Sequence, residues 1–143
     1  MKIILIAQLL STLFMVGLIW FVQVVHYPLF RNVGTDQFVQ YEFLHQKLTT
    51  WVVGPAMLLE LITAVALVRF SAPDSTLLPW IGVGLVGIIW ISTAALQVPA
   101  HNSLSLQFSA DACSMLVNSN WIRTVAWSAR GILVLILTYR RLV

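Results

Sequence analysis

The sequence predicts an all-α integral membrane protein, a bundle of four transmembrane helices that run alternately up and down. Of its 143 residues, 59% are apolar and only 9% are charged, whereas a soluble domain carries about 25% charged residues. The mean hydropathy is +0.90. Apolar runs of about 18 residues or longer recur along the chain, and such runs are typical of membrane-spanning helices. We expect one four-span domain, 1–143, with spans at about 3–26, 48–69, 77–98 and 121–139.

The first span is expected at residues 3–26, an apolar run that Lys2 precedes. The run is too long for the core of a signal peptide, and no small-residue cleavage site follows it, so we expect it to be retained. Pro28 lacks a backbone donor and disfavours the helical conformation at Tyr27. The span is therefore expected to end near His26.

The second helix is expected to begin at Asp36, after a break at Gly34, and to reach about Arg69. Such a helix is roughly 50 Å long, which exceeds the ~30 Å hydrocarbon core. Its first dozen residues are polar and are expected to project beyond the bilayer. The spanning part is then about 48–69, with a kink expected at Pro55.

Residues 71–75 predict a short turn before the third span at 77–98, which Pro99 is expected to close. Residues 101–119 mix polar and apolar types, and they predict an interfacial loop with a short helix. The fourth span follows at 121–139.

The basic residues near the span ends predict the orientation. They divide four against two: Lys2, Arg69, Arg140 and Arg141 on the side of the termini, Arg31 and Lys47 on the other. Cytoplasmic ends carry an excess of basic residues, so we expect a multi-pass protein of the cell inner membrane with cytoplasmic N- and C-termini. In either orientation the first and third connections share one side.

The formal charge of +3 is spread too thinly to bind nucleic acid.

Two opposite charges fall in the middle of predicted spans. Glu60 lies nine residues after Trp51, and Arg130 lies nine residues after Trp121, on helices that run in the same direction. An unpaired charge at the bilayer centre costs at least about 2.5–3.5 kcal/mol, so a buried ion pair between Glu60 and Arg130 is expected. The favoured interpretation is a pair that fixes helix register. The alternative is a small carrier of protons or metal ions.

Three histidines are expected at the outer ends of the helices: His26, His45 and His101. Glu42 precedes His45 by three residues, which places both side chains on one helical face. Imidazoles with a carboxylate suit iron, copper or zinc, and two histidines also suit the axial positions of a haem. The sequence thus predicts that the three histidines hold a metal ion (iron or copper) or a haem, with Glu42 as a further metal ligand. The alternative is that histidines at span ends only bond loop backbone or lipid headgroups.

Asn120 and Arg123 lie on the polar seam of the fourth span, toward the histidines. We interpret them as catalytic residues that orient the substrate, with Arg123 anchoring an anionic or enolate oxygen. The alternative is an arginine that extends to the membrane interface.

The single Cys113 excludes an intrachain disulfide and a multi-cysteine metal site. No nucleophile elbow, phosphate loop or nucleotide-binding glycine pattern is present.

Two short stretches carry a family resemblance. Residues 97–102 read Gln-Val-Pro-Ala-His-Asn, and residues 120–123 read Asn-Trp-Ile-Arg, with Trp127 one turn further on. The sequence resembles the anthrone-oxygenase-like proteins, small four-span membrane proteins with a proline–asparagine turn after span three and an Asn-x-x-Arg start to span four. The three histidines look more like a bacterial branch of such proteins. The resemblance implies a small-molecule site, with redox chemistry as one use, at one end of a four-helix bundle.

The function expected from these features is that of a membrane-embedded oxidoreductase or oxygenase-like protein acting on a lipophilic small molecule at the outer helix ends. The alternative, from a different class, is a non-catalytic accessory subunit in a larger membrane complex. The sequence leaves open whether the protein is an enzyme. The expected partners are the lipid bilayer, a lipophilic substrate, and either further copies of the chain or a larger complex.

Overall fold

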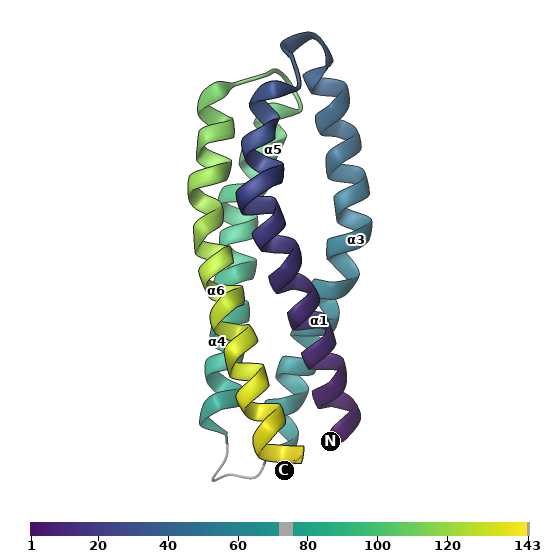
Figure 1. Ribbon diagram of the computed structural model, residues 1–143, viewed down its shortest axis with the longest axis vertical. Helices are drawn as coiled ribbons and strands as arrows, with labels where there is room; N and C mark the ends of the chain where they lie inside the picture. The colour runs from purple at the N-terminus through teal and green to yellow at the C-terminus, as the bar shows by residue number, and fades with distance from the viewer. Residues whose placement is uncertain (72–75, 143) are drawn as a thin grey trace.

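The computed structural model describes residues 1–71 and 76–142, and this part of the chain is helical except for short connections. Four long helical segments stand side by side (Figure 1). The first consists of α1 (Lys2–Phe21), the π-helical turn η1 (Val22–His26), α2 (Tyr27–Leu29) and the short 3-10 helix η2 (Phe30–Asn32). The others are α3 (Thr35–Phe70), then α4 (Leu77–Ser92) with the π-helical turn η4 (Thr93–Gln97) and α5 (Val98–Leu104), and finally α6 (Ala110–Leu142). The turn expected at 71–75 falls, apart from Ser71, outside the described residues.

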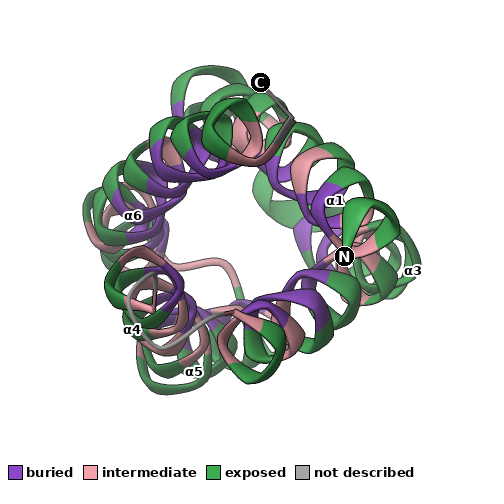
Figure 2. Ribbon diagram, turned by 90° about the horizontal axis from the view of Figure 1, so that it is seen from below, coloured by how far each residue is buried: buried purple, intermediate pink, exposed green. Residues whose placement is uncertain are grey.

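The four segments close into a ring in chain order. α1 packs against α3 and α6, and α4 packs against the same two helices. Figure 2 shows the buried faces of the helices turned inward and the exposed faces turned outward. Both termini lie at one end of the bundle, and the connections that precede α3 and α6 lie at the other (Figure 1). The predicted all-α, up-down arrangement of four helices is confirmed, as is the shared side of the two connections.

Each segment is long and apolar enough to cross a membrane, namely Lys2–Asn32, Thr35–Phe70, Leu77–Leu104 and Ala110–Arg141. In the most apolar stretch of each, at most half of the residues are buried within the bundle. The remaining apolar side chains face outward, and this is the surface that a bundle surrounded by hydrocarbon requires.

The helices continue past Pro28 and Pro99, where the sequence predicted that they end. Each proline follows a π-helical turn, and the residue before it keeps helical angles (φ −65°, ψ −41° at Tyr27; φ −59°, ψ −48° at Val98). A π turn contains one extra residue, which widens the helix and separates the proline ring from the carbonyl of the preceding turn. The first and third segments therefore extend to Asn32 and Leu104.

The expected loop at 101–119 is also shorter than predicted, because α6 begins at Ala110. Ser109 accepts a hydrogen bond from the backbone N–H of Ala112 at 3.2 Å, which satisfies one of the free donors at the helix start. At the other connection, Gly34 adopts φ 85°, a left-handed value that favours glycine, and α3 begins at Thr35, one residue before the predicted start at Asp36.

The interior is layered along the bundle axis. Three apolar clusters alternate with two polar layers, and each cluster takes residues from several helices. The polar layer nearer the connections, here called the histidine layer, contains His26, Tyr27, Glu42, His45, His101, Asn120 and Arg123. The other, here called the Glu60 layer, contains Gln8, Thr12, Glu60, Thr63 and Arg130.

Candidate metal centre

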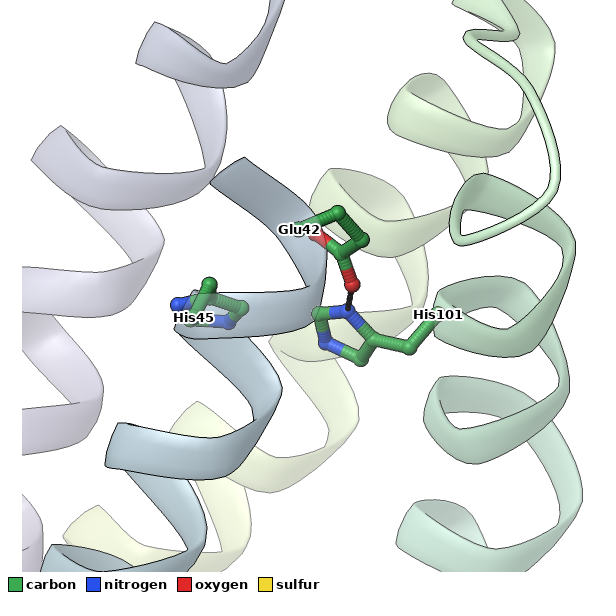
Figure 3. Close-up of side chains that lie close together, drawn as sticks. All are labelled: Glu42, His45 and His101. Carbon is green, nitrogen blue, oxygen red and sulfur yellow. Dashed lines mark hydrogen bonds and ion pairs between the residues drawn. The ribbon is translucent and has the colours of Figure 1, made fainter. Parts of the chain in front are cut away.

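Glu42, His45 and His101 come together in the histidine layer. One ligand atom of each lies within 4.8 Å of the others. Figure 3 shows the Glu42 carboxylate directed at the His101 ring, with His45 beside them on the same helix as Glu42. The distance between His101 Nδ1 and Glu42 Oε1 is 2.6 Å. The Glu-x-x-His spacing on α3 thus faces a histidine from α5, which is the arrangement that a shared site needs.

Glu42 is fully buried, and its two oxygens differ in their surroundings. Oε1 accepts hydrogen bonds from His101 and from Gln46 Nε2, the latter at 3.1 Å. Oε2 has no hydrogen-bond partner in the described part of the chain. A buried polar atom without a partner costs about 1–3 kcal/mol, and more when it is charged. This buried oxygen therefore favours a further partner inside the cluster.

His26 joins the cluster through His45. Its Nε2 lies 2.9 Å from His45 Nδ1, and the Thr49 hydroxyl lies 3.1 Å from that same nitrogen. The ring centroids are 4.7 Å apart between His26 and His45, and 5.3 Å apart between His45 and His101. The three predicted histidines form one continuous row with His45 at its centre. His45 thus contacts both of the other histidines.

Arg123 and Tyr27 extend the hydrogen-bond network of the histidine layer beyond His101. Arg123 Nη2 donates to the Tyr27 hydroxyl at 3.1 Å, and that hydroxyl lies 3.0 Å from His101 Nε2. With the contact between His101 Nδ1 and Glu42 Oε1, these bonds make a continuous hydrogen-bonded path from Arg123 through Tyr27 and His101 to Glu42, in which the tautomer of His101 sets the donor at each of its nitrogens. Asn120 Oδ1 accepts from Arg123 Nε at 3.0 Å and from Nη2 at 2.5 Å, which holds the guanidinium group in place.

The interpretation of Arg123 as an arginine that extends to the interface is wrong. Its side chain is only 7% exposed, and its partners are Tyr27 and Asn120 in the bundle interior. Both residues predicted on the fourth seam thus contribute to the histidine layer.

Tyr27 is the member of the layer that sequence reasoning missed. At the end of the first segment Gln23 and Tyr27 are the buried residues, whereas His26, the residue that the sequence placed in the site, is partly exposed. The extra residue of the π turn rotates the chain beyond it, so the inward position moves by one residue. The only sequence signal for this shift is Pro28, which lies within a pattern that otherwise reads as helix.

Two pockets meet at His45. The first, here called the inner pocket, has a volume of about 330 Å³ and is lined by residues that include Tyr27, His101 and Arg123. The second, here called the α1–α3 groove, has a volume of about 480 Å³ and is lined by α1, η1 and α3. Both volumes fall within the range of small-molecule sites. His45 lines both, so a ligand in either pocket contacts the cluster.

Glu60 and Arg130 form the ion pair that their matched depth predicts. Arg130 Nε lies 3.0 Å from Glu60 Oε1, and both side chains are buried. Thr12 donates to Oε1 at 2.7 Å, Trp127 Nε1 donates to Oε2 at 2.8 Å, and Arg130 Nη1 donates to the Gly82 carbonyl at 2.5 Å. Both carboxylate oxygens are thus satisfied within the protein, which favours the interpretation of a pair that fixes register.

No protein-family model, curated protein or solved structure matches the chain. The resemblance to the anthrone-oxygenase-like proteins stays a prediction from short motifs. The fold and the site together define a class: a bundle of four helices of membrane-spanning length, with a cluster of one buried carboxylate and two partly buried histidines near the end that carries two of its connections.

Proposed function

We propose that this chain is a multi-pass protein of the cell inner membrane, with cytoplasmic termini, that binds a transition-metal ion at Glu42, His45 and His101. The observation that carries the proposal is the convergence of these three ligand atoms within 4.8 Å, together with the buried, unpartnered Oε2 of Glu42. A bound metal ion would give this oxygen the partner that it lacks. The excess of basic residues at the terminus end supports the orientation.

The ligand set favours iron, with copper as the alternative. Two imidazoles and one carboxylate are the ligands of non-haem iron(II) sites, which keep positions open for oxygen and substrate. The geometry argues against a haem between two of the histidines. The rings of His26, His45 and His101 are 4.7 Å and 5.3 Å apart between neighbours, and His26 and His45 share a direct hydrogen bond, so there is no gap for a macrocycle.

The proposed activity is oxidation of a lipophilic small molecule with dioxygen as the oxidant. A bound iron would supply the oxygen chemistry, and the chain's own residues bind and orient the substrate. Arg123 lines the inner pocket and is held by Asn120, so its guanidinium group is preorganised to attract an anionic or enolate oxygen. Tyr27, between Arg123 and His101, is placed to hold or release a proton beside that oxygen.

Metal titration of the purified protein tests the proposal. Glu42→Gln keeps the size of the side chain and removes its charge, so we expect iron(II) affinity to fall at least about 10–100-fold. Asp36→Asn is the matched control, because Asp36 is an exposed carboxylate on the same helix. Equal affinity in wild type, Glu42→Gln and Asp36→Asn would place the metal elsewhere. A wild-type protein that binds neither iron nor copper would favour the accessory-subunit interpretation.

A further inference from the structure

The α1–α3 groove changes in polarity along its length. Its lining extends from Leu18 to His26 on the first segment and from Tyr41 to Val53 on α3. The two segments run in opposite directions (Figure 1). His26 and Tyr41 are therefore the lining residues nearer in sequence to the connection between the segments, and Leu18 and Val53 are those further from it. At the helical rise these stretches extend over roughly 12–18 Å. The groove therefore lies along the bundle axis. Its polar end is toward the connections and its apolar end is toward the middle of the bundle, as the head and tail of a membrane lipid are arranged.

The side of the groove is open to the surroundings of the bundle. Phe21, Leu44, Leu48 and Val52 all line it, and all four are exposed apolar side chains. In a bundle that spans the membrane, these side chains face hydrocarbon. A ligand therefore reaches the groove sideways from the lipid, without crossing the packed interior.

The polar end of the groove is built from aromatic rings. Phe21 stacks on His26 at 6.1 Å with 23° between the planes, and Tyr41 stacks on His45 at 6.3 Å with 9° between the planes. These distances are typical of offset aromatic stacking. A planar ring of a ligand can stack on the same side chains. The polar groups at the same place are His26, His45 and Thr49, where His26 Nε2 and the Thr49 hydroxyl both contact His45 Nδ1, so a ligand's polar group meets the two remaining ring nitrogens, His26 Nδ1 and His45 Nε2.

The lining of the groove favours a ligand whose head group is uncharged. Among the described residues that line the groove there is no lysine, arginine, aspartate or glutamate. A phosphate or carboxylate head would find no cation there to offset its loss of water. A hydroxyl or carbonyl group, by contrast, is satisfied by imidazole nitrogens, which donate or accept according to tautomer.

We propose that the α1–α3 groove binds an amphiphile with a planar, hydroxylated aromatic head and an apolar tail, of the alkylated or prenylated phenol and quinol class. The head stacks among Phe21, His26, Tyr41 and His45, and the tail extends toward the middle of the bundle. This inference rests on the proposed function, because it names a substrate class for the same cluster, with the substrate reaching His45 from the α1–α3 groove rather than from the inner pocket that Arg123 lines. His45 lines the groove and belongs to the metal site, so the bound head lies beside the ion.

Decylhydroquinone is the probe for this proposal, with the protein reconstituted in lipid nanodiscs. We expect it to bind at least about tenfold more tightly than hydroquinone, which lacks the tail, and than decanol, which lacks the ring. If decanol binds as tightly as decylhydroquinone, the proposal of an aromatic head is wrong. If hydroquinone binds as tightly as decylhydroquinone, the proposed contribution of the tail is wrong.

Two tryptophan substitutions locate the binding. Leu48→Trp fills the groove at a position that is 63% exposed, and Val65→Trp adds the same side chain on α3 outside the groove, at a position that is 52% exposed. We expect Leu48→Trp to weaken decylhydroquinone binding at least about tenfold and Val65→Trp to leave it unchanged. Equal effects of the two substitutions would overturn the proposal.

Metal content measured on the same samples separates this inference from the proposed function. If wild type and Leu48→Trp both hold iron and neither binds the probe, the groove proposal is wrong and the metal centre stands. If wild type binds the probe, Leu48→Trp does not, and neither holds metal, the groove binds this class of amphiphile and the proposed oxidation is wrong.

Discussion

At the residue scale, the histidine layer is connected by a continuous chain of hydrogen bonds. Arg123 donates to the Tyr27 hydroxyl, which lies 3.0 Å from His101 Nε2, and His101 Nδ1 lies 2.6 Å from Glu42 Oε1. Five residues build this chain and hold it in place: Tyr27, Glu42, His101, Asn120 and Arg123. The sequence identified all of them except Tyr27, because residue spacing along a helix and the depth of residues in neighbouring helices can be estimated from a sequence. Tyr27 was missed, because its inward position depends on a π turn.

Tyr27→Phe removes the hydroxyl that links Arg123 to His101. The buried guanidinium then loses a hydrogen-bond partner, so we expect the free energy of unfolding in detergent to fall by about 1–3 kcal/mol. Metal affinity is expected to change less than in Glu42→Gln, because Tyr27 is not one of the three proposed ligands. Tyr139→Phe, at an exposed position near the end of α6, is the control. Equal stability of Tyr27→Phe and wild type would show that this chain of hydrogen bonds contributes nothing to the fold.

The Glu60–Arg130 pair makes a second residue-scale prediction. Arg130→Leu leaves Glu60 buried without its charge partner, and we expect a loss of about 3–5 kcal/mol in the free energy of unfolding. The double variant Glu60→Gln with Arg130→Leu removes both charges and is expected to recover much of that loss. Denaturant unfolding of the three proteins measures the difference. A double variant no more stable than Arg130→Leu alone would contradict the buried-pair account.

At the element scale, the two π turns decide which side chains enter the site. The apolar runs of the sequence predicted the four helices, because hydropathy depends on composition over a whole turn or more. The helix ends at Pro28 and Pro99 were predicted wrongly, because a proline signals a lost donor but does not show how the chain accommodates it. Here the accommodation is a widened turn. It carries the helix onward and turns Tyr27 into the bundle.

Pro28→Ala tests whether the proline maintains the π turn η1. Alanine restores the backbone donor and removes the clash, so the α-helical register becomes available and the side chains of His26 and Tyr27 rotate out of place. We expect iron affinity to fall about 10–100-fold with little change in helix content by circular dichroism. Pro55→Ala, at an exposed position of α3 outside both π turns, is expected to keep wild-type affinity. Wild-type affinity in Pro28→Ala would show that packing alone maintains the turn.

At the scale of the whole molecule, the bundle combines an apolar outer surface with two polar layers inside. The sequence predicted both layers in outline, since a charged or polar residue within an apolar run has to turn inward. The pockets could not be predicted, because they depend on how side chains of neighbouring helices fill the space between them. Residues 18–26 and 41–53 form a groove only because two antiparallel segments place them side by side.

The orientation of the bundle is tested by thiol labelling in intact cells. In a Cys113→Ser background, a cysteine at Leu106, which is 83% exposed at the connection end, is expected to react with a membrane-impermeant reagent. A cysteine at Lys2, at the terminus end, is expected to be protected. Labelling at position 2 but not at 106 would invert the orientation and leave the helix pairing unchanged.

The central claim is that the carboxylate–histidine cluster holds a metal ion, and the metal content of the protein as purified from its own membrane tests it most directly. Mass spectrometry of the element content should find about one equivalent of iron, or of copper, per chain in wild type. The variant in which His26, His45 and His101 are all alanine should contain none. The account is contradicted if wild type carries no transition metal, or if the triple variant carries as much as wild type.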